Sequence, residues 1–491
     1  MQLSIQSQRA LRAAEAFYRA DLDVVLRAST FAERTAGQLE FFHGVVAQVP
    51  AYAEFLRVNG VDAHAVRTAE DFQGLPTTSK QNYHRAYPLA ALCRGGQLSA
   101  SDFVAMSSGS TGEPTVWPRF VADEFGTAQR FEQVLADTFQ GRTRRTLGVV
   151  CFALGSWVGG MFTTLACRHV AAKGYPLTLV TPGSNILEIL RVVRALGSAF
   201  DQVVLFGYPP FLKDVIDAGR ADGLAWEALR TGLVTAGEVF SESWRQLLCD
   251  KIGAKDPAFA TASLYGTADG GVLANETPLS INVRRFLAER PAAAHALFGE
   301  SRLPTLCQYD PLHRAFEAPG GDLLFTGDGG VPLVRYGILD RGGVYEQRDL
   351  LTRLADFGFT PTFDERTREL PFVFVFGRSG FAVSLYGANV YPENVSLGLE
   401  RAEVAPWVTG KFVLSVTESA ELELVVELAR GVEPRAEFAD VVALGVQVEL
   451  ERVNSEFRAY VPESKRKPVV RLLPHGDAAY FPSGVKHRYT R

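Results

Sequence analysis

The chain of 491 residues is 47% hydrophobic and 21% charged, the proportions of a globular protein of two or three domains. Its net charge of −5 excludes the strong basic surplus of a protein that binds nucleic acid or an anionic membrane. The cysteines are odd in number and scattered, at Cys93, Cys151, Cys167, Cys249 and Cys307. This spacing fits a reducing cytosol and suggests neither a disulfide framework nor a zinc site, so we expect a cytoplasmic protein.

The first 60 residues are expected to be largely helical. Apolar side chains recur at helical spacing at Leu39, Phe42, Val45, Val46, Val49 and Tyr52. The N-terminal segment contains no apolar core long enough for a signal peptide. Further on, Thr68 and Asp71 have the spacing of a capping box, and Pro76 ends the helix that would follow.

The segment SSGSTGEPT, residues 107–115, is the first candidate binding site. Gly109 and Gly112 let the backbone turn where a side chain would clash, and consecutive N–H groups in such a loop can form an anion nest. Hydroxyls lie among them at Ser107, Ser108, Ser110 and Thr111. A Walker loop would continue with Lys, whereas Gly112 is followed by Glu113. Taken alone, the segment is compatible with a phosphate loop or with a flexible polar linker.

Residues 147–167 carry no charge and have about the length of a membrane-spanning helix. Glycines and hydroxyl side chains interrupt this stretch. We therefore predict a buried strand over 146–152 followed by a glycine-rich helix start, because α/β cores commonly contain such runs.

From about residue 144 to 300, apolar strands alternate with helices, which indicates α/β layers. Strands are predicted at 147–152, 176–183, 202–210 and 231–237, and helices at 184–197 and 209–219. From about residue 320, strand residues separated by Gly and Asp turns predict antiparallel hairpins. A boundary is predicted near residues 376–380, followed by a small domain with strands at 421–429 and 446–453.

Three further motifs follow the glycine-rich loop. In SLYGTADGG, residues 263–271, Asp269 could hold Mg²⁺ through an oxygen, although a tight turn after a strand has a similar composition. In PLVRYGILDRGG, residues 332–343, Asp340 could bind a ribose diol, and a hairpin-turn acid is the alternative. The fourth motif is FGRSGFAVSLYGANVYPENV, residues 376–395. The order and spacing of the motifs carry more weight than any one of them.

Together these motifs resemble those of the adenylate-forming superfamily of acyl-CoA synthetases, adenylation domains and luciferases, most closely its phenylacetate–CoA ligase branch. The resemblance covers roughly residues 35–395, including TAGEVFSESW at 235–244, which looks like the adenine-lining segment. SLYGTAD is similar to YGxSE, and PLVRYGILD is similar to PLIRYRTGD. GRSGFAVSLYGANVYPENV is similar to the segment that opens a mobile C-terminal domain. The resemblance implies a large AMP-binding domain over 1–376, a hinge at 377–380 and a small mobile α+β domain over 381–491.

The resemblance also implies which residues bind ATP. The β- and γ-phosphates would lie in the loop formed by Ser107, Ser108, Gly109, Ser110, Thr111 and Gly112. Gly237 and Glu238 would flank the adenine, and Tyr265, with Gly266 after it in the motif, would stack on the ring. Asp340 would bind the ribose hydroxyls, and Arg378 would lie near the hinge and the phosphate.

Three residues would take part in the chemistry. Thr267 would reach the α-phosphate, and Asp269 would hold Mg²⁺. Lys486, in PSGVKHRY, would reach the α-phosphate and the carboxylate oxygens of the acid. Lys465 and Lys467 are competitors for this role, and a solvated tail lysine is the alternative for Lys486.

The chain departs from the family pattern at several positions. Glu113 stands in place of the loop lysine, Asp269 in place of a glutamate, and Ala268 in place of a hydroxyl residue. Residues 379–381 read Ser-Gly-Phe and lack the usual hinge aspartate. We expect ATP-dependent activation of a carboxylic acid, with AMP and pyrophosphate as products and CoA as the acceptor. The alternatives are transfer to an amine or a carrier protein, and a catalytically weakened nucleotide- or acyl-binding relative.

The acid itself is only broadly indicated. Segments that form the acid pocket in relatives contain Trp157, Phe162, Phe206, Tyr208 and Phe211, which favours an aromatic or apolar acid. Core packing is the more common role of such side chains. We expect no nucleic-acid or membrane partner, and a homodimer remains open.

Overall fold

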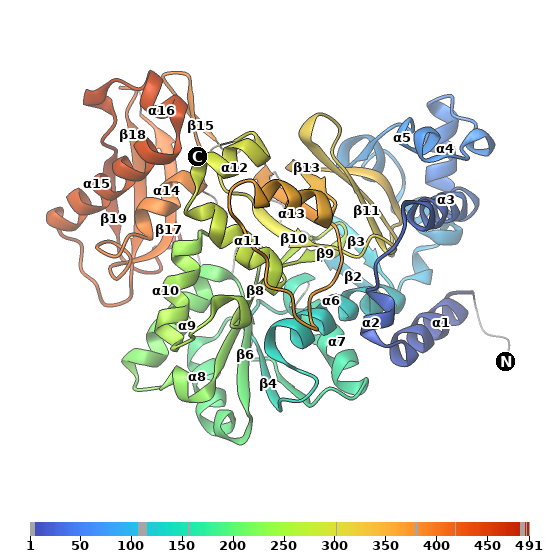
Figure 1. Ribbon diagram of the computed structural model, residues 1–491, viewed down its shortest axis with the longest axis horizontal. Coiled ribbons are helices and arrows are strands. Elements are labelled where there is room, and N and C mark those ends of the chain that lie inside the picture. The colour runs from blue at the N-terminus through green and yellow to red at the C-terminus, as the bar shows by residue number, and fades with distance from the viewer. Residues whose placement is uncertain are drawn as a thin grey trace.

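The computed structural model divides into a large part and a smaller C-terminal part, drawn in orange and red (Figure 1). It describes residues 5–106, 115–155, 158–300, 302–378, 382–417, 419–481, 487, 489 and 490. For Ile5, Ala100, Val158 and Arg378 it describes the backbone alone. The predicted α/β fold class, with a separate smaller C-terminal domain, is confirmed.

The N-terminal region is helical, as predicted. Its helices are α1 (Ile5–Arg19), α2 (Leu22–Val25), α3 (Phe31–Gln48), α4 (Pro50–Val58) and α5 (Ala69–Gln73). The predicted capping box is present at α5, where the Asp71 N–H donates to Thr68 Oγ1 at 3.1 Å and the Thr68 N–H donates to Asp71 Oδ2 at 2.9 Å. These helices pack through Phe42, Val45 and Tyr52 against the antiparallel half of the central sheet.

One half of the 12-stranded central sheet is parallel. It runs in the order β5–β4–β6–β7–β8, with β4 (Thr146–Val150), β5 (Leu177–Val180), β6 (Gln202–Gly207), β7 (Thr231–Ala236) and β8 (Thr261–Thr267). Helices cover both faces: α6 (Val121–Phe139) and α7 (Val158–Ala172) on one, and α8 (Ile186–Leu196), α9 (Pro209–Ala221) and α10 (Glu242–Ile252) on the other. In β6, Val203 and Leu205 enter one hydrophobic cluster, and Val204 and Phe206 enter the other.

Burial on both faces explains why these strands read as continuous apolar runs. The uncharged stretch at 147–167 divides between β4 and α7, as predicted. None of the helices in the described residues has both the length and the apolarity that a membrane crossing requires.

The other half of the sheet is antiparallel, and the predicted hairpins are confirmed. Beyond β8 it continues through β9 (Gly271–Asn275), β10 (Thr305–Gln308), β14 (Phe372–Arg378), β13 (Leu333–Tyr345), β12 (Asp322–Gly327) and β11 (Arg314–Glu317). Helices α11 (Pro278–Ala288), α12 (Pro291–Phe298) and α13 (Gln347–Ala355) pack beside it. The short strand β1 (Thr78–Ser79) adds to β13 in parallel, with Thr78 opposite Tyr336. A separate hairpin pairs β2 (Phe103–Met106) with β3 (Val116–Arg119).

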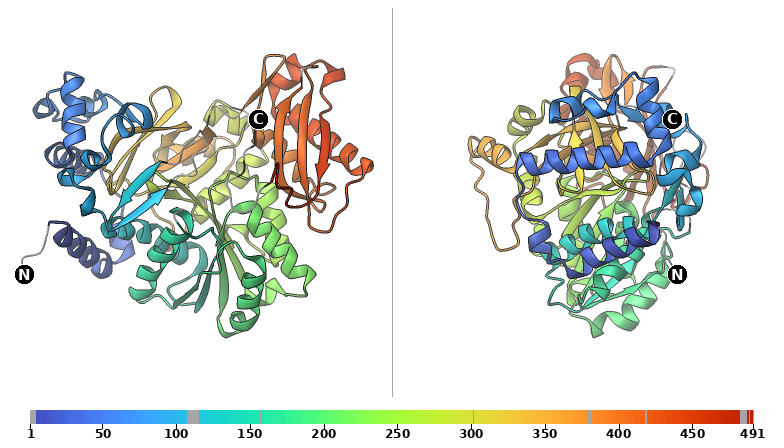
Figure 2. Two further views of the ribbon diagram at one scale, coloured as in Figure 1. Left: turned by 180° about the vertical axis from the view of Figure 1, so that it is seen from behind. Right: turned by 90° about the vertical axis from the view of Figure 1, so that its right-hand side faces the viewer.

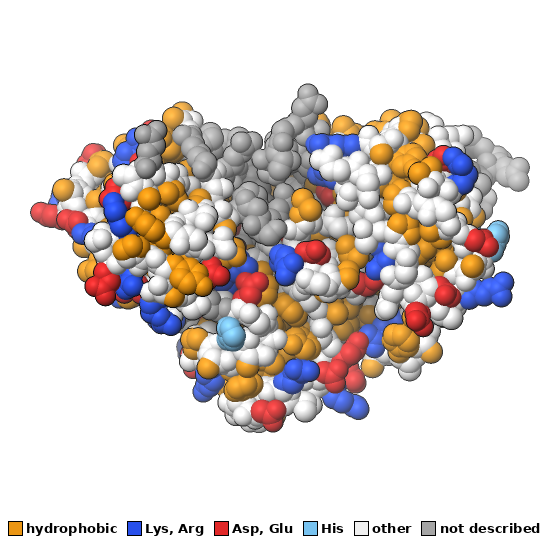
Figure 3. Space-filling model, turned by 90° about the horizontal axis from the view of Figure 1, so that it is seen from above, with side chains coloured by type: hydrophobic (Ala, Val, Ile, Leu, Met, Phe, Trp, Pro, Cys, Tyr) orange, Lys and Arg blue, Asp and Glu red, His pale blue; other side chains and the backbone are white. Residues whose placement is uncertain are grey.

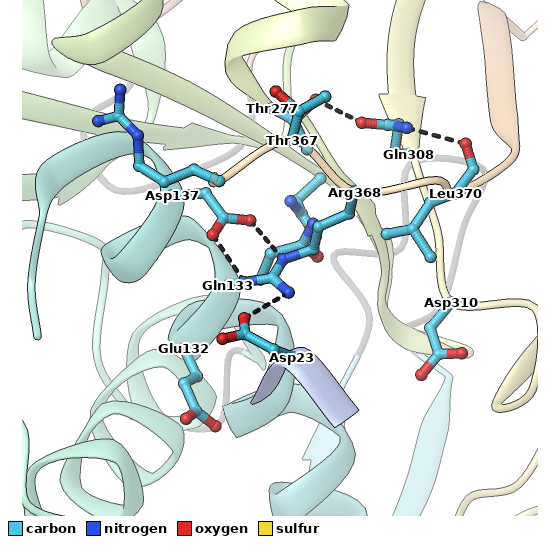
Figure 4. A network of polar contacts seen from close by, with 12 residues as sticks. Asp23, Glu132, Gln133, Asp137, Thr277, Gln308, Asp310, Thr367, Arg368 and Leu370 are labelled. Atoms are coloured by element: carbon cyan, nitrogen blue, oxygen red, sulfur yellow. Dashed lines mark hydrogen bonds and ion pairs between the residues drawn. The ribbon is translucent and has the colours of Figure 1, made fainter. Parts of the chain in front are cut away.

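The long connection between α13 and β14 is bound to α6 by a partly buried arginine (Figure 4). Arg368 donates to both carboxylate oxygens of Asp137, at 2.8 and 2.9 Å, and its other nitrogen lies 2.8 Å from Asp23 Oδ1. The planar guanidinium matches the carboxylate in a bidentate pair, which fixes orientation as well as distance. Helix α2, helix α6 and the connection are therefore joined at one point.

The C-terminal part has its own sheet and core. It contains β15 (Val383–Leu385), β16 (Ala388–Val390), α14 (Pro392–Leu399), β17 (Val408–Val416), β18 (Leu422–Leu428), α15 (Ala436–Val453), α16 (Ser455–Tyr460) and β19 (Val469–Leu473). Strands β17, β18 and β19 form one sheet in that order. This part lies at the opposite end of the molecule from α3 and α4 (Figure 2). On the face in Figure 3, acidic and basic side chains are interspersed.

The predicted strand at 446–453 is wrong, because these residues form the end of α15. The local alternation of Val446, Val448 and Leu450 resembles a strand. Over the whole helix, the buried side chains Val442, Val446 and Leu450 recur every four residues, while Val448 is exposed. The helical period over 18 residues therefore outweighs a two-residue alternation over five.

The large part contacts the small C-terminal domain through α9 and the start of α10. The ammonium of Lys213 donates to the Val408 carbonyl at 2.9 Å. The Ser241 hydroxyl, which caps α10, donates to the Glu400 carboxyl group at the end of α14. These contacts are polar, whereas each part buries its own apolar core.

Candidate functional site

Some of the predicted site residues lie just beyond the carboxyl ends of three neighbouring parallel strands. Tyr208 follows β6, Gly237 and Glu238 follow β7, and Asp269 follows β8. In open α/β sheets this edge is where ligands bind, because the loops there leave a crevice. Gly237 has φ +91°, a conformation that strongly favours glycine and lets the chain turn sharply after β7.

The predicted adenine-lining segment is in contact with the C-terminal tail. The hydroxyl of Tyr208 donates to Glu238. The phenol of Tyr489 is also hydrogen-bonded to Glu238, and burial together with this carboxylate raises the pKa of Tyr489 well above its ordinary value. Tyr489 is held beside β17 by the hydrogen bond from the Leu414 N–H to its carbonyl. This contact could not be predicted from the sequence, since a tyrosine near the end of a chain carries no signal of its partner.

Asp340 lies within β13 and not in a turn, so the hairpin-turn alternative is wrong. Its Oδ2 atom accepts a hydrogen bond of 2.8 Å from the hydroxyl of Tyr265 on β8. The Cα of Arg378 on β14 stands opposite Asp340 in the ladder. Leu339, immediately before it, has φ +68°, which is uncommon for a residue other than glycine and turns the strand locally.

Asp269 lies in the turn between β8 and β9, as the alternative of a tight turn after a strand predicted, and its binding of Mg²⁺ stays a prediction. Its Oδ2 atom accepts a hydrogen bond of 2.7 Å from Tyr336 on β13. Its Oδ1 atom is 3.8 Å from the ammonium of Lys80, beyond direct hydrogen-bonding length. The hydroxyl of Thr267 accepts the Gly270 N–H at 3.0 Å, which closes the turn.

Lys80, for which the sequence indicates no role, lies beside Asp269. It follows β1, whose pairing with β13 brings it beside Tyr336 and Asp269. Its ammonium also lies over the ring of Trp117, 5.9 Å from the centroid. A lone lysine in the sequence carries no sign that a two-residue strand will bring it to the candidate site.

Arg119, at the end of β3, ties the hairpin to the acid turn. One of its terminal nitrogens donates to the Ala268 carbonyl and lies 3.3 Å from the Asp269 carbonyl. The side chain is buried, and its guanidinium stands 5.4 Å from the ring centre of Phe162. This contact joins the hairpin of β2 and β3 to the turn that holds Asp269.

The aromatic residues predicted to line the acid pocket have different surroundings. Phe206 is fully buried and packs 5.9 Å from Phe131 of α6. Phe162 is buried on α7, and Phe211 packs with the cluster under α8 and α9. Tyr208 lies at the sheet edge beside Glu238. Their predicted role in acid binding stays a prediction.

Several predicted residues lie outside the described part of the chain: Ser107, Ser108, Gly109, Ser110, Thr111, Gly112, Trp157, Lys486 and the side chain of Arg378. The two competing lysines are described. Lys465 lies 3.0 Å from Glu421 and Lys467 lies 2.9 Å from Asp440. Both acids belong to the small domain, so each lysine is engaged locally there.

The predicted Mg²⁺ site would have one protein carboxylate. Among the described residues, no three His, Cys, Asp or Glu side chains gather as a metal-binding group. Mg²⁺ commonly binds through one or two carboxylates together with substrate phosphates and water. The Oδ1 atom of Asp269, held by a turn beside a lysine, fits that mode of binding.

Comparison with known proteins confirms the fold. No family model matches the sequence, and no curated protein sequence matches it. The crystal structure of 2-hydroxyisobutyryl-CoA ligase in the postadenylation state with 2-HIB-AMP superimposes with a TM-score of 0.67, at 15% identity, over 96% of this chain and 94% of that chain. Its open conformation with 2-HIB-AMP and CoA gives 0.55, at 15% identity, over 94% and 90%. Its thioesterification state gives 0.54, at 16% identity, over 91% and 88%. The chain thus has the fold of this ligase, as the resemblance of the motifs implied.

Proposed function

We propose that this protein activates a carboxylic acid with ATP, forming an acyl-adenylate and pyrophosphate. The observation that carries the proposal is a pair of hydrogen bonds between two of the motifs. One runs from Tyr265 to Asp340, and the other from Tyr336 to Asp269. These bonds join the motif of the candidate phosphate-side acid, Asp269, to that of the candidate ribose ligand, Asp340, although β8 and β13 are not neighbours in the sheet. The fold of a CoA ligase bound to an acyl-AMP supports it.

The reaction is a substitution at phosphorus. One oxygen of the acid attacks the α-phosphorus of ATP, and the bond from that phosphorus to the bridging oxygen of pyrophosphate breaks. The product is a mixed anhydride whose leaving group is AMP, in place of the oxide that makes a free carboxylate unreactive. Catalysis of this kind depends chiefly on positioning and on the neutralisation of charge.

Residues of the chain would divide this work. Asp340 would receive the ribose hydroxyls, and Tyr265 would lie beside the adenine. The ammonium of Lys80, near Asp269, would face the phosphates, a role for which the loop itself offers only Glu113. When bound at Asp269, Mg²⁺ would supply further neutralisation of the phosphate charge.

The tail would supply a second cation. Tyr489, three residues after Lys486, contacts Glu238 in the predicted adenine-lining segment. This contact supports Lys486 as the small-domain lysine that reaches the α-phosphate. Lys486→Ala should lower acid-dependent exchange by orders of magnitude with little change in ATP affinity, whereas Lys467→Ala should be nearly neutral.

Transfer to an acceptor would follow adenylation. We propose CoA as the acceptor, an aromatic or apolar acid as the substrate, and residues 377–380 as the hinge for movement of the small domain. Transfer to an amine or a carrier protein is the outcome that would replace the CoA part of the proposal. It would leave the adenylation step intact.

Acid-dependent exchange of labelled pyrophosphate into ATP tests the first step. We expect exchange with at least one member of a panel of aryl and alkyl acids in the presence of Mg²⁺, and none without acid. Mass spectrometry of products with CoA or with amines then identifies the acceptor. No exchange across a broad panel, by protein that binds ATP, would contradict the proposal.

A further inference from the structure

Two segments of this chain share the pattern Tyr-Gly-x-x-Asp. One runs from Tyr265 to Asp269 and the other from Tyr336 to Asp340. In the structure each tyrosine donates to the aspartate of the other segment, at 2.8 Å from Tyr265 to Asp340 and at 2.7 Å from Tyr336 to Asp269. The two segments are therefore reciprocally joined.

Tyr336 is held so that its hydroxyl has a defined position. Its side chain is fully buried. The ring meets Trp117 edge-on at 6.3 Å and Phe325 at 5.7 Å. A ring fixed on these two sides presents its hydroxyl to one carboxylate oxygen of Asp269, the Oδ2 atom.

The rest of Asp269 is also oriented. Arg119 donates to the carbonyls of Ala268 and Asp269, which fixes the backbone of the turn. With Oδ2 engaged by the tyrosine, Oδ1 is the oxygen that faces the Lys80 ammonium at 3.8 Å. Without the tyrosine, the carboxylate could rotate about its terminal bond, since that torsion is broad.

We propose that Tyr336 is a positioning residue that sets which oxygen of Asp269 is presented to the triphosphate and its Mg²⁺. This proposal rests on the proposed function and adds a residue that the nucleotide itself need not touch. Tyr265 acts on the other acid, so its hydroxyl orients the ribose ligand Asp340. Two hydroxyls with the same sequence spacing thus act on different ends of one substrate.

The test compares Tyr336→Phe with Tyr265→Phe, because each removes one hydroxyl and keeps its ring. Calorimetry measures ATP affinity with Mg²⁺ and with EDTA, and exchange assays give kcat and KM. In Tyr336→Phe we expect the Mg²⁺-dependent gain in ATP affinity to shrink and kcat to fall by about tenfold. Affinity in EDTA should stay within about twofold of the wild-type value. In Tyr265→Phe we expect weaker ATP binding with and without Mg²⁺, and a Mg²⁺-dependent gain that is kept.

Tyr345→Phe is the matched control. Tyr345 lies on the same strand, β13, and its hydroxyl donates to the Leu297 carbonyl at 2.7 Å, on the side of α12. Its loss should lower thermal stability without changing the effect of Mg²⁺. In a protein that already carries Asp269→Asn, Tyr336→Phe should have almost no further effect. A residue that acts through the charge of Asp269 has nothing to act on once that charge is absent.

A Tyr336→Phe protein that keeps the full Mg²⁺-dependent gain would overturn the inference, as would additive effects in the Asp269→Asn background. The proposed function fails separately, if the wild-type protein exchanges no pyrophosphate with any acid. The calorimetric comparison still decides the role of Tyr336 in that case. The inference would also be overturned if the wild-type protein bound ATP with the same affinity in Mg²⁺ and in EDTA.

Discussion

Asp269 and Asp340 occupy equivalent places in two similar sequence segments but very different places in the fold. Asp340 lies inside a 13-residue strand, paired with β12 on one side and β14 on the other. Asp269 lies in the short turn between β8 and β9, with the ammonium of Lys80 near one oxygen. Each accepts a hydrogen bond from the tyrosine of the other segment.

The difference separates two tasks in one site. A carboxylate inside a sheet has a fixed backbone on both sides, which suits a ligand that does not change during the reaction, such as a ribose. A carboxylate in a turn can be surrounded by other groups, which suits the end of the substrate where charge moves. The comparison therefore predicts that Asp340 governs affinity and that Asp269 governs rate.

Asp269→Ala should give the largest effect. Removing a group that stabilises charge in the transition state typically lowers the rate by about a hundredfold to a thousandfold. We expect acid-dependent exchange to fall by roughly that factor, with a much smaller change in ATP affinity measured in EDTA. A loss of affinity as large as the loss of rate would break the distinction between the two acids.

Asp340→Ala should give the second-largest effect, and this effect should be on ATP affinity and not on the rate of exchange. Loss of a hydrogen bond to a charged group costs about 1.5–3 kcal/mol, or roughly ten- to a hundredfold in affinity. We expect calorimetry to show this weakening for ATP and also for AMP, because both carry the ribose. Thermal unfolding checks that β13 remains intact, and unchanged affinity in a stable protein would remove Asp340 from the site.

The sequence predicted the strands β4 to β7, the N-terminal helices, and α8 and α9, because burial on both faces of these strands leaves plain apolar runs. It misread 446–453, where a short alternation concealed the helical period of α15. It placed Asp269 and Asp340 in a site through their motifs. It could not show that Tyr336 bonds to Asp269 or that Lys80 approaches it, since both depend on pairing between segments far apart in the sequence.

Lys80→Ala should give a smaller effect on the rate. The ammonium is partly exposed and 3.8 Å from Asp269, so solvent screens its charge. We expect exchange to fall by about tenfold, with KM for ATP changing less. Lys80→Arg keeps the charge and is the control. If Lys80→Ala weakens ATP binding as strongly as Asp340→Ala, the lysine governs ATP affinity, as Asp340 does, and not the rate.

The contact between Ser241 and Glu400 predicts an effect of pH that should not involve Asp269 or Asp340. Glu400 lies at the end of α14, and Ser241 caps α10 of the large domain. Burial raises the pKa of Glu400 to about 8, and the hydrogen bonds from Ser241 and the charge of Arg284 only partly oppose this. Glu242 and Tyr489 are the other titratable groups acting on or near it.

The direction of the pH dependence follows from the raised pKa of Glu400. Because burial raises the pKa of Glu400 from its ordinary value of 4.5 to about 8, burying this side chain contributes its full stability only below about pH 4.5, and this stability is lost as pH rises through about 8. Between pH 7 and pH 9, exchange should slow as the small domain is held less firmly, while ATP affinity stays within about twofold, since neither Asp269 nor Asp340 belongs to this contact. Small-angle scattering should show the molecule expanding over the same range. Glu400→Gln keeps the shape of the side chain without the titration, so it should flatten both profiles. If Glu400→Gln retains the wild-type pH profile, the group that titrates lies elsewhere, and domain placement is not set by this contact.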